Sequence, residues 1–589
     1  MTEPPTNRAL AERFREAATL VDLLGENAFK AIAFARVAAA LEALPEEVAA
    51  LHGSGGREAL EAVKGIGRSS AAILSALLER GRSEDLEALA ARLPPEVPAM
   101  LELPGLGPKT VGRLWRERGI GTFSALSAAL EDGSLATLDG LGPKTLERIR
   151  DGLALRAAAA GRRDLGRARA LGVELLARLE AIDGVARVAE AGPARRGCET
   201  VDGLAFAIEA APGTDPRSIL DAFAGLDGVA RARVDPDGAD GPGAVAEVDG
   251  GLPVEVRVAP PSRFGAALCR LTGSEAHHRR LRALAAERGL ALDGRDASGG
   301  ARPGTFVAGG SEASVYAALG LAWVPPELRE DTGEIELAAR GAVPALIEAA
   351  DYRGDLHCHT VASDGTATID EMAEAARALG RAYLAITDHS VSQRQANGLD
   401  TGRLLAHAEA VREANARTDG IELLAGTECD ILADGRLDYD DATLAELDWV
   451  IASPHVALRQ GARAATIRLL CAIENPYVNA IGHPTGRLIG TRAGLPIDAA
   501  AVFAAAARTG TALEINASHR RLDLSAELAR AALGAGCRLS INTDAHAARG
   551  LGKLDGGLAT ARRAEAGAGD VINCLGVADL RAFVAAKRP

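Results

Sequence analysis

The sequence predicts a multidomain chain of mixed class, with an α-helical front followed by α/β regions. It has 589 residues, of which 48% are apolar and 25% charged, enough for several separate cores. Glycine loops repeat between helix-periodic stretches in the first 165 residues. From residue 354 onward, short apolar strands alternate with helical stretches. That alternation is typical of parallel β/α units, which place functional groups at the carboxyl ends of their strands.

Composition and charge exclude several classes of protein. The longest apolar runs, such as residues 499–507, are too short to span a bilayer, and the N-terminal MTEPPTNRAL lacks the layout of a secretory signal. The seven cysteines form no CxxC pair, so we expect reduced thiols, a cytoplasmic location and no membrane partner. The net charge is −14, and residues 1–165 carry 21 Lys and Arg against 23 Asp and Glu. Any contact with DNA must therefore use local backbone groups or metal ions.

The helical front contains a threefold repeat. Residues 7–48 predict two amphipathic helices separated by the Gly25-Glu26-Asn27 break. Three glycine loops follow, each opening a helix-like stretch, and two of them read GLGPKT. This is typical of the helix-hairpin-helix motif, whose glycines allow a tight turn and present N–H groups to a phosphate. The alternative is that the loops are structural turns only. We expect contact with the DNA backbone, without base readout, from Gly65, Gly67, Gly105, Gly107, Lys109, Gly140, Gly142 and Lys144.

The middle of the chain, residues 166–345, predicts a mixed α/β region. A helix is expected at 167–181, and strands at 204–210, 244–248 and 254–259. Two glycine-rich stretches predict a connecting loop at 235–243 and a second, flexible break at 296–304.

The last third concentrates metal-ligand residues. Eight of the eleven histidines follow residue 350. His357 and His359 are two apart, a spacing that directs both imidazoles to one face of a strand. Strands are predicted at 382–387, 421–425, 449–453, 512–516 and 538–542. Polar clusters with His, Asp or Glu end four of them, all but 512–516, and a further cluster stands at 482–484. His407 and His519 fit no such pattern and are not expected to bind a metal ion. The expected metal ligands are His357, His359, Asp364, His389, Glu428, His455, His483, Asp544 and His546.

This constellation resembles the PHP (polymerase and histidinol phosphatase) phosphoesterases over roughly residues 350–589. The resemblance implies a distorted β/α barrel that holds up to three Mn²⁺ or Zn²⁺ ions, and it implies which residues hold each ion. The first, catalytic ion would take His357, His359, Glu428 and Asp544. The second would share Glu428 and take His455 and His483, and the third would take Asp364, His389 and His546.

Upstream, the chain resembles the bacterial family X DNA polymerases. The order of helices, glycine hairpins, α/β region and PHP domain matches, as do Arg195-Arg196, Glu199-Thr200-Val201, Thr272-Gly273-Ser274 and the stretches at 25–30 and 325–330. The resemblance implies five parts. They are an N-terminal helical domain with the first hairpin (1–90), hairpin repeats (91–165), a polymerase β-like palm (166–260), a thumb-like domain (261–345) and the PHP domain (346–589).

The palm departs from the family at its catalytic carboxylates. Family members read Gly-Asp-hydrophobic-Asp after Glu-Thr-Val, where this chain has Gly203 and Ala205 at the aspartate positions. Asp202 lies one residue away, which on a strand is the opposite face. Glu255 stands where the family has its third aspartate. Pro193, which lacks an N–H, stands where the family has a phosphate-binding serine. We expect a degenerate palm without a Mg²⁺ site. A shift in strand register that restores Asp202 is the alternative.

These observations predict a metal-dependent 3′–5′ exonuclease or DNA phosphodiesterase acting in DNA repair, with polymerase activity lost. One alternative is an active gap-filling polymerase with a PHP exonuclease, against which the missing aspartates count. Another is a small-molecule phosphatase, which has no use for three glycine hairpins. A DNA-binding scaffold without catalysis is at odds with the full set of ligand-type residues.

Overall fold

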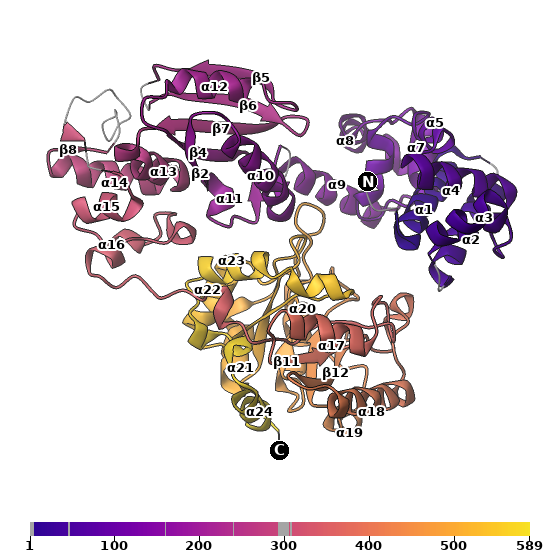
Figure 1. The fold of residues 1–589 in the computed structure, drawn as a ribbon. Helices are drawn as coiled ribbons and strands as arrows, with labels where there is room; N and C mark the ends of the chain where they lie inside the picture. Colours follow the sequence, from indigo (N-terminus) through magenta and orange to yellow (C-terminus); the bar gives the residue numbers. More distant parts are fainter. Residues whose placement is uncertain are drawn as a thin grey trace. The chain divides into compact units, whose positions relative to one another are not determined.

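The computed structural model describes residues 5–26, 28–44, 47–138, 140–158, 161–238, 241–292, 305–306 and 309–588 (Figure 1). The chain divides into two compact units, one of residues 1–158 with 490–492 and one of residues 159–489 with 493–589. Across the described ranges, no helix has both the length and the apolar character needed to cross a membrane.

The first unit is built from helices around two apolar clusters. The two helices predicted within residues 7–48 are confirmed, and Phe14 of the first meets Phe34 of the second edge to face, with ring centroids 5.7 Å apart. The helices are α1 (Asn7–Leu24), α2 (Ala28–Ala43), α3 (Val48–Glu61), α4 (Arg68–Arg80), α5 (Glu84–Ala90), α6 (Glu96–Ala99), α7 (Pro108–Arg118), α8 (Phe123–Glu131) and α9 (Pro143–Ala158).

The second unit begins with a five-stranded sheet in the order β2-β4-β7-β6-β5, in which only β4 and β7 run parallel. The three predicted strands and the predicted helix are confirmed. β2 and β5 were not predicted because both lie at the edges of the sheet, where a strand needs little apolar patterning. The elements are β1 (Arg163–Asp164), α10 (Leu165–Glu180), β2 (Val185–Ala191), α11 (Gly192–Arg195), β3 (Thr200–Val201), β4 (Leu204–Ala210), α12 (Pro216–Ala224), β5 (Ala230–Asp235), β6 (Gly243–Val248) and β7 (Leu252–Ala259).

The two loops predicted in this region have different outcomes. The stretch 235–243 joins β5 to β6, as predicted, although residues 239 and 240 are not described. The flexible break predicted at 296–304 lies outside the described residues.

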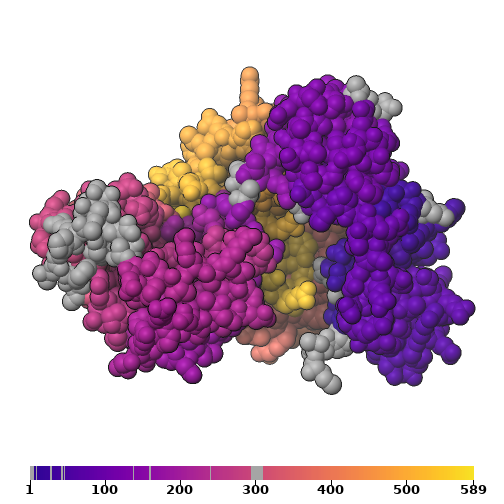
Figure 2. Space-filling view, turned by 90° about the horizontal axis from the view of Figure 1, so that it is seen from above, coloured from indigo at the N-terminus to yellow at the C-terminus, as the bar shows by residue number. Residues whose placement is uncertain are grey.

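Four helices follow the sheet along the chain, and residues of this region form part of the face seen in Figure 2. Glu312 on the third of them binds two arginines. It accepts hydrogen bonds from Arg195 Nη1 at 2.8 Å, Arg195 Nη2 at 2.7 Å and Arg329 Nη1 at 2.5 Å. Arg196 donates to Glu330 at 2.9 Å and to the Thr272 carbonyl at 2.7 Å. Arg195 and Arg196, at the end of α11, therefore tie the segment after β2 to the helical part. The helices are α13 (Phe264–Thr272), α14 (Glu275–Glu287), α15 (Glu312–Ala318) and α16 (Glu334–Ala339).

The last part of the second unit is a seven-stranded parallel sheet in chain order, β10 to β16. A bridge between Cys358 and Ala545 brings its first and last edges together, so the sheet nearly closes into the expected barrel, with helices outside it (Figure 1). The strands are β10 (Gly354–Asp355), β11 (Tyr383–Ile386), β12 (Glu422–Asp430), β13 (Trp449–Ser453), β14 (Ala480–Ile481), β15 (Ala512–Asn516) and β16 (Leu539–Asn542). The helices are α17 (Ile369–Ala378), α18 (Thr401–Arg417), α19 (Asp441–Ala445), α20 (Ala462–Glu474), α21 (Ala499–Thr509), α22 (Ala526–Gly534), α23 (Asp555–Arg563) and α24 (Val577–Ala585).

We expect Glu312→Gln to lower the free energy of unfolding by about 3 kcal/mol, because it leaves two guanidinium groups without their buried carboxylate. Burial opposes ionisation of Glu312, but hydrogen bonds from Arg195 and Arg329 outweigh it and lower the pKa from 4.5 to about 2. This stabilisation is therefore present above pH 4.5 and is lost as the pH falls toward 2. Urea unfolding at pH 7 and pH 3 measures both effects. Glu336→Gln, which removes an exposed partner of Arg280, is the control. Equal midpoints for Glu312→Gln and the wild type would contradict the assignment.

Candidate functional site

Nine ligand-type side chains converge at the carboxyl end of the parallel sheet. Most lie on the segments that follow β10, β11, β13, β14 and β16. β10 ends at Asp355, earlier than the predicted strand, but the bridge at Cys358 keeps the His357–His359 segment extended. Glu428 differs from the others because it lies inside β12, which runs five residues beyond the predicted end. The extension contains polar residues, so a pattern of apolar residues did not predict it.

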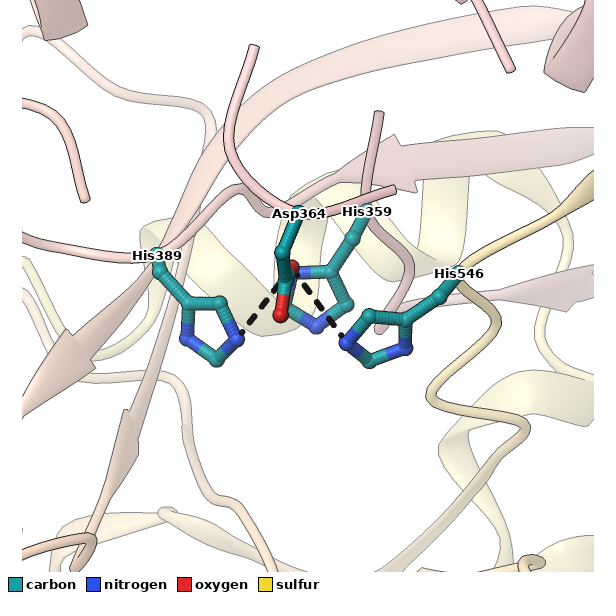
Figure 3. Close-up of side chains that lie close together, drawn as sticks. All are labelled: His359, Asp364, His389 and His546. Carbon is teal, nitrogen blue, oxygen red and sulfur yellow. Dashed lines mark ion pairs between the residues drawn. The ribbon is translucent and has the colours of Figure 1, made fainter. Parts of the chain in front are cut away.

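One group of side chains surrounds Asp364 (Figure 3). Asp364 Oδ1 lies 3.6 Å from His389 Nε2, 3.4 Å from His546 Nε2 and 4.0 Å from His359 Nδ1. The two nearer imidazoles approach the carboxylate from opposite sides, and all four side chains point into the same space (Figure 3). Three imidazole nitrogens and a carboxylate in one place match the ligand preferences of Zn²⁺ and Mn²⁺.

A second group surrounds Glu428. Its Oε1 lies 2.9 Å from His483 Nε2, 3.2 Å from His455 Nε2 and 3.3 Å from His357 Nε2. Its Oε2 lies 2.9 Å from His389 Nδ1 and 3.6 Å from His359 Nε2. One carboxylate therefore touches five imidazoles, which is the arrangement expected of a ligand that bridges cations.

Asp544 completes the cluster. Its Oδ1 lies 3.1 Å from His359 Nε2 and 3.6 Å from His357 Nε2. Possible metal-binding groups therefore form around Asp364, around Asp544 and around Glu428. His359 and His389 each belong to two of these groups, whereas the family resemblance gives each of them to one ion. All nine residues lie together, and their division among three ions stays a prediction.

Unpaired buried atoms provide a test of whether these residues suit metal ions. Within the described part of the chain, neither carboxylate oxygen of Glu428 accepts a hydrogen bond, and neither His357 Nε2 nor His359 Nδ1 has a hydrogen-bond partner. Glu428 is 1% exposed, and His357 and His359 are fully buried. Polar atoms left unpaired inside a protein are costly, and metal coordination removes that cost. The donor set therefore fits divalent cations.

The electrostatics of the cluster lead to the same conclusion. Burial alone favours a neutral Glu428, but His455, His357 and His389 outweigh it and lower its pKa well below the ordinary value. Burial likewise lowers the pKa of His389, but Glu428 and Asp364 outweigh it and raise that pKa to about 10. In His359, burial and the neighbouring imidazoles lower the pKa to about 4, which leaves a neutral ring with a free lone pair. The carboxylates favour positive charge in the site, which a divalent cation would supply.

Two carboxylates that were not predicted from the sequence orient imidazoles of the cluster by bonding their Nδ1 atoms. Glu514 on β15 accepts a hydrogen bond from His357 Nδ1 at 2.8 Å, which leaves Nε2 facing the cluster. Asp430 accepts one from His455 Nδ1 in the same way. Each left a signal in the sequence, because Asp430 stands two residues after Glu428 on one strand face and Glu514 interrupts an apolar strand. His407 lies outside the cluster, as expected, and bonds Asp388 at 2.8 Å.

The three glycine loops of the first unit share one geometry. In each, the first glycine has a positive φ of 86° to 104°, a conformation that other residues rarely adopt. The apolar residue between the glycines is buried, and its N–H donates to the carbonyl three residues back, at 3.0 to 3.2 Å. A Cβ added to the second glycine would meet nothing within 4 Å at Gly67, Gly107 or Gly142. Gly67 and Gly107 begin α4 and α7 without a side-chain cap, so the first N–H groups of those helices have no side-chain acceptor from the cap residue.

Of the three carboxylate positions expected in the palm-like sheet, only one holds a carboxylate, Glu255. Ala205 pairs with Glu255 across β4 and β7, and Glu255 binds Arg257 Nε at 2.8 Å. Ala205 is 8% exposed, in an apolar cluster with residues of α13. Asp202 precedes β4, is 68% exposed and lies 3.6 Å from Arg162. The strand pairing therefore does not bring Asp202 beside Glu255.

The amino-acid sequence matches four domain families. A helix-hairpin-helix domain matches residues 5–83, a SAM-like helix-hairpin-helix tandem 97–155, the DNA polymerase beta thumb 267–330 and the PHP domain 355–485. The four matches occur along the chain in the order expected from the resemblance.

Whole-chain similarity is consistent with this order. The "DNA polymerase/3'-5' exonuclease PolX" of Bacillus subtilis (strain 168) is 34% identical over 569 residues, covering 96% of this chain and 97% of that protein. The chain therefore belongs to the bacterial family X DNA polymerases that carry a C-terminal PHP domain. A "Probable phosphatase" of Shewanella sediminis (strain HAW-EB3) is 34% identical over 224 residues, covering 36% of this chain and 86% of that protein. A probable phosphatase of Caldanaerobacter subterraneus is 32% identical over 212 residues, 34% of this chain and 79% of that protein.

Reconstitution with Mn²⁺ or Zn²⁺ should give up to three metal equivalents per chain by elemental analysis. Glu428→Gln should lose at least one equivalent, because it removes the carboxylate that five imidazoles approach. Glu422→Gln is a matched control on the same strand, since Glu422 pairs with the exposed Arg581. Less than one equivalent in the reconstituted wild type would contradict a multinuclear site.

Proposed function

We propose that this protein is a metal-dependent 3′–5′ exonuclease or DNA phosphodiesterase of the family, acting in DNA repair, whose polymerase activity has been lost. The observation that carries the proposal is a contrast between its two candidate centres. All nine ligand-type positions of the PHP centre are filled and lie together, whereas the palm has one carboxylate, Glu255, where the family has three.

The chemistry of the PHP centre suits phosphodiester hydrolysis. Divalent ions bound there would supply Lewis-acid stabilisation of charge on a phosphate and a source of activated water. The chain's own contribution is orientation. Glu514 and Asp430 fix the rings of His357 and His455, so the ligand atoms are held in place before a substrate arrives.

DNA is the substrate that the remainder of the chain supports. The three loops offer helix N-termini whose second glycine leaves open space for a phosphate oxygen. Such contacts hold the backbone without reading bases, and they need no basic surface, which fits the net charge of −14.

A small-molecule phosphatase is the second candidate, because the similarity to probable phosphatases is independent of the polymerase-like half. That similarity covers only 34% to 36% of this chain and leaves the glycine loops without a role.

Loss of polymerase activity follows from charge and packing in the palm. Two-metal nucleotidyl transfer needs carboxylates on both ions. Here Glu255 is paired with Arg257, and Ala205 is covered by apolar residues of α13. A bound Mg²⁺ would compete with a guanidinium for one carboxylate, so we propose no Mg²⁺ site in the palm.

Incubation with a primed DNA template, Mn²⁺ and all four nucleotides should shorten the primer from its 3′ end and should not extend it. Mg²⁺ in place of Mn²⁺ should also give no extension, because Gly203 and Ala205 offer no ligand atom. Template-directed extension by the unmodified protein would show that Asp202 and Glu255 suffice. Hydrolysis of histidinol phosphate without any shortening of DNA would favour the phosphatase.

Variants of the glycine loops and of the metal centre should separate binding from chemistry. Gly107→Val with Gly142→Val should weaken DNA binding about tenfold or more while sparing a small chromogenic diester, because the new side chains fill space that the free protein leaves open. His359→Ala should do the reverse, abolishing both hydrolyses while DNA affinity stays near wild type. Fluorescence anisotropy and hydrolysis rates measure the two effects. A glycine variant with unchanged DNA affinity would show that the loops are structural turns.

A further inference from the structure

Two loops beside the metal centre contain strained backbone. His483 has a φ of 25° and Leu522 a φ of 41°, in the left-handed region that residues with a side chain rarely adopt. Such conformations are unfavourable for residues with a side chain and persist only where surrounding contacts hold them. His483 is a predicted ligand, so the contacts that hold its turn also hold the metal centre.

Arg487 connects the two strained loops. The turn that begins at His483 is closed by a hydrogen bond from the Gly486 N–H to the His483 carbonyl at 2.8 Å. In the next residue, Arg487, Nε donates to the Arg521 carbonyl at 2.9 Å and Nη2 to the Leu522 carbonyl at 2.5 Å. The second loop also reaches the cluster, because Arg521 Nε lies 3.9 Å from Asp544 Oδ2.

A carboxylate of the polymerase-like region, Glu199 just before β3, holds Arg487 in turn. Glu199 Oε2 accepts a hydrogen bond from Arg487 Nη2 at 2.6 Å, across 288 positions of the sequence. The backbone of Glu199 is fixed as well, since its carbonyl accepts from the Leu165 N–H at 3.1 Å. Of the three acceptors described for Arg487, only Glu199 carries a negative charge, and charge-assisted hydrogen bonds are about twice as strong as neutral ones.

The surroundings of Glu199 are polar, so apolar packing does not explain this contact. Glu199 lines a cavity of about 280 Å³ whose walls also include Arg196, Glu330 and Arg563. A comparable ion pair joins Glu327 to Arg562 at 2.7 Å, but it reaches α23 and not a loop that carries a predicted ligand.

We propose that Glu199 is a positioning residue for the metal centre of the PHP domain, acting through Arg487 on the turn that carries His483. The inference rests on the proposed function, because it assigns hydrolysis to that centre. It gives the palm a role that needs none of the missing aspartates. The segment before β3 supplies the charge that keeps Arg487, and with it two strained loops, in one conformation.

Hydrogen–deuterium exchange of the full chain tests the positioning directly. Glu199→Gln should speed the exchange of amides in 483–489 and 520–524 at least threefold, because neutralising the carboxylate loosens Arg487. Glu327→Gln is the matched control, since it removes an ion pair of similar length that does not touch these loops. Unchanged exchange in Glu199→Gln, or an equal change in Glu327→Gln, would overturn the inference whether or not the protein is a nuclease.

The kinetic consequence is tested on thymidine 5′-(p-nitrophenyl phosphate) with Mn²⁺. Glu199→Gln should lower kcat about fivefold with little change in KM, a smaller loss than for a direct partner of a ligand, because Glu199 acts one step further away through Arg487. Arg487→Gln should lower kcat further, and adding Glu199→Gln to it should change nothing more, because Glu199 acts through Arg487. Independent, multiplying losses in the double variant would contradict that route. A wild type that hydrolyses neither this diester nor DNA would refute the proposed function, and the exchange experiment would still decide the positioning.

Discussion

Glu428 carries a negative charge in the interior of the barrel, with five imidazoles around its two oxygens. A buried carboxylate is stable only where other groups compensate it, and no hydrogen bond from the described residues does so here. The histidines that face it come from the segments after β10, β11, β13 and β14, so its position constrains four strand ends at once. The rest of the centre follows from this constraint. Glu514 and Asp430 hold rings from behind, and Asp364 and Asp544 add charge that further cations would balance.

The core of the polymerase-like sheet does not depend on the carboxylates that the family has in its palm. Its core lies on the face formed by Leu204, Phe206 and Val254, and the expected carboxylates belong to the other face. Replacing them with Gly203 and Ala205 therefore removes no core contact, and Ala205 joins a smaller apolar cluster with α13. Arg195 and Arg196, which match the family, have structural partners in Glu312 and Glu330. These ion pairs give both arginines a structural role that does not depend on binding a nucleotide.

The helical N-terminal region explains how an acidic chain could still contact DNA. A repeated backbone shape, built on a positive φ and an open second glycine, presents N–H groups where a phosphate can approach. Because the donors are main-chain groups, the net charge of the region matters less than it would for a patch of lysines. The same arrangement would hold DNA at any sequence, which suits an enzyme that acts on strand ends.

The amino-acid sequence by itself determined the domain order, the parallel barrel and the convergence of the nine ligand-type residues. This was possible because strand ends of a parallel sheet meet at one edge, so residues such as His389, His455 and Asp544 need only their place after a strand to be brought together. Only the tertiary structure determined which residues hydrogen-bond to the ligand-type residues and to the loops that carry them. It paired Glu514 with His357 and Glu199 with Arg487, across 157 and 288 positions. It also decided that β2 and β5 are strands, because an edge strand is specified by the neighbour it bonds and not by an apolar pattern of its own.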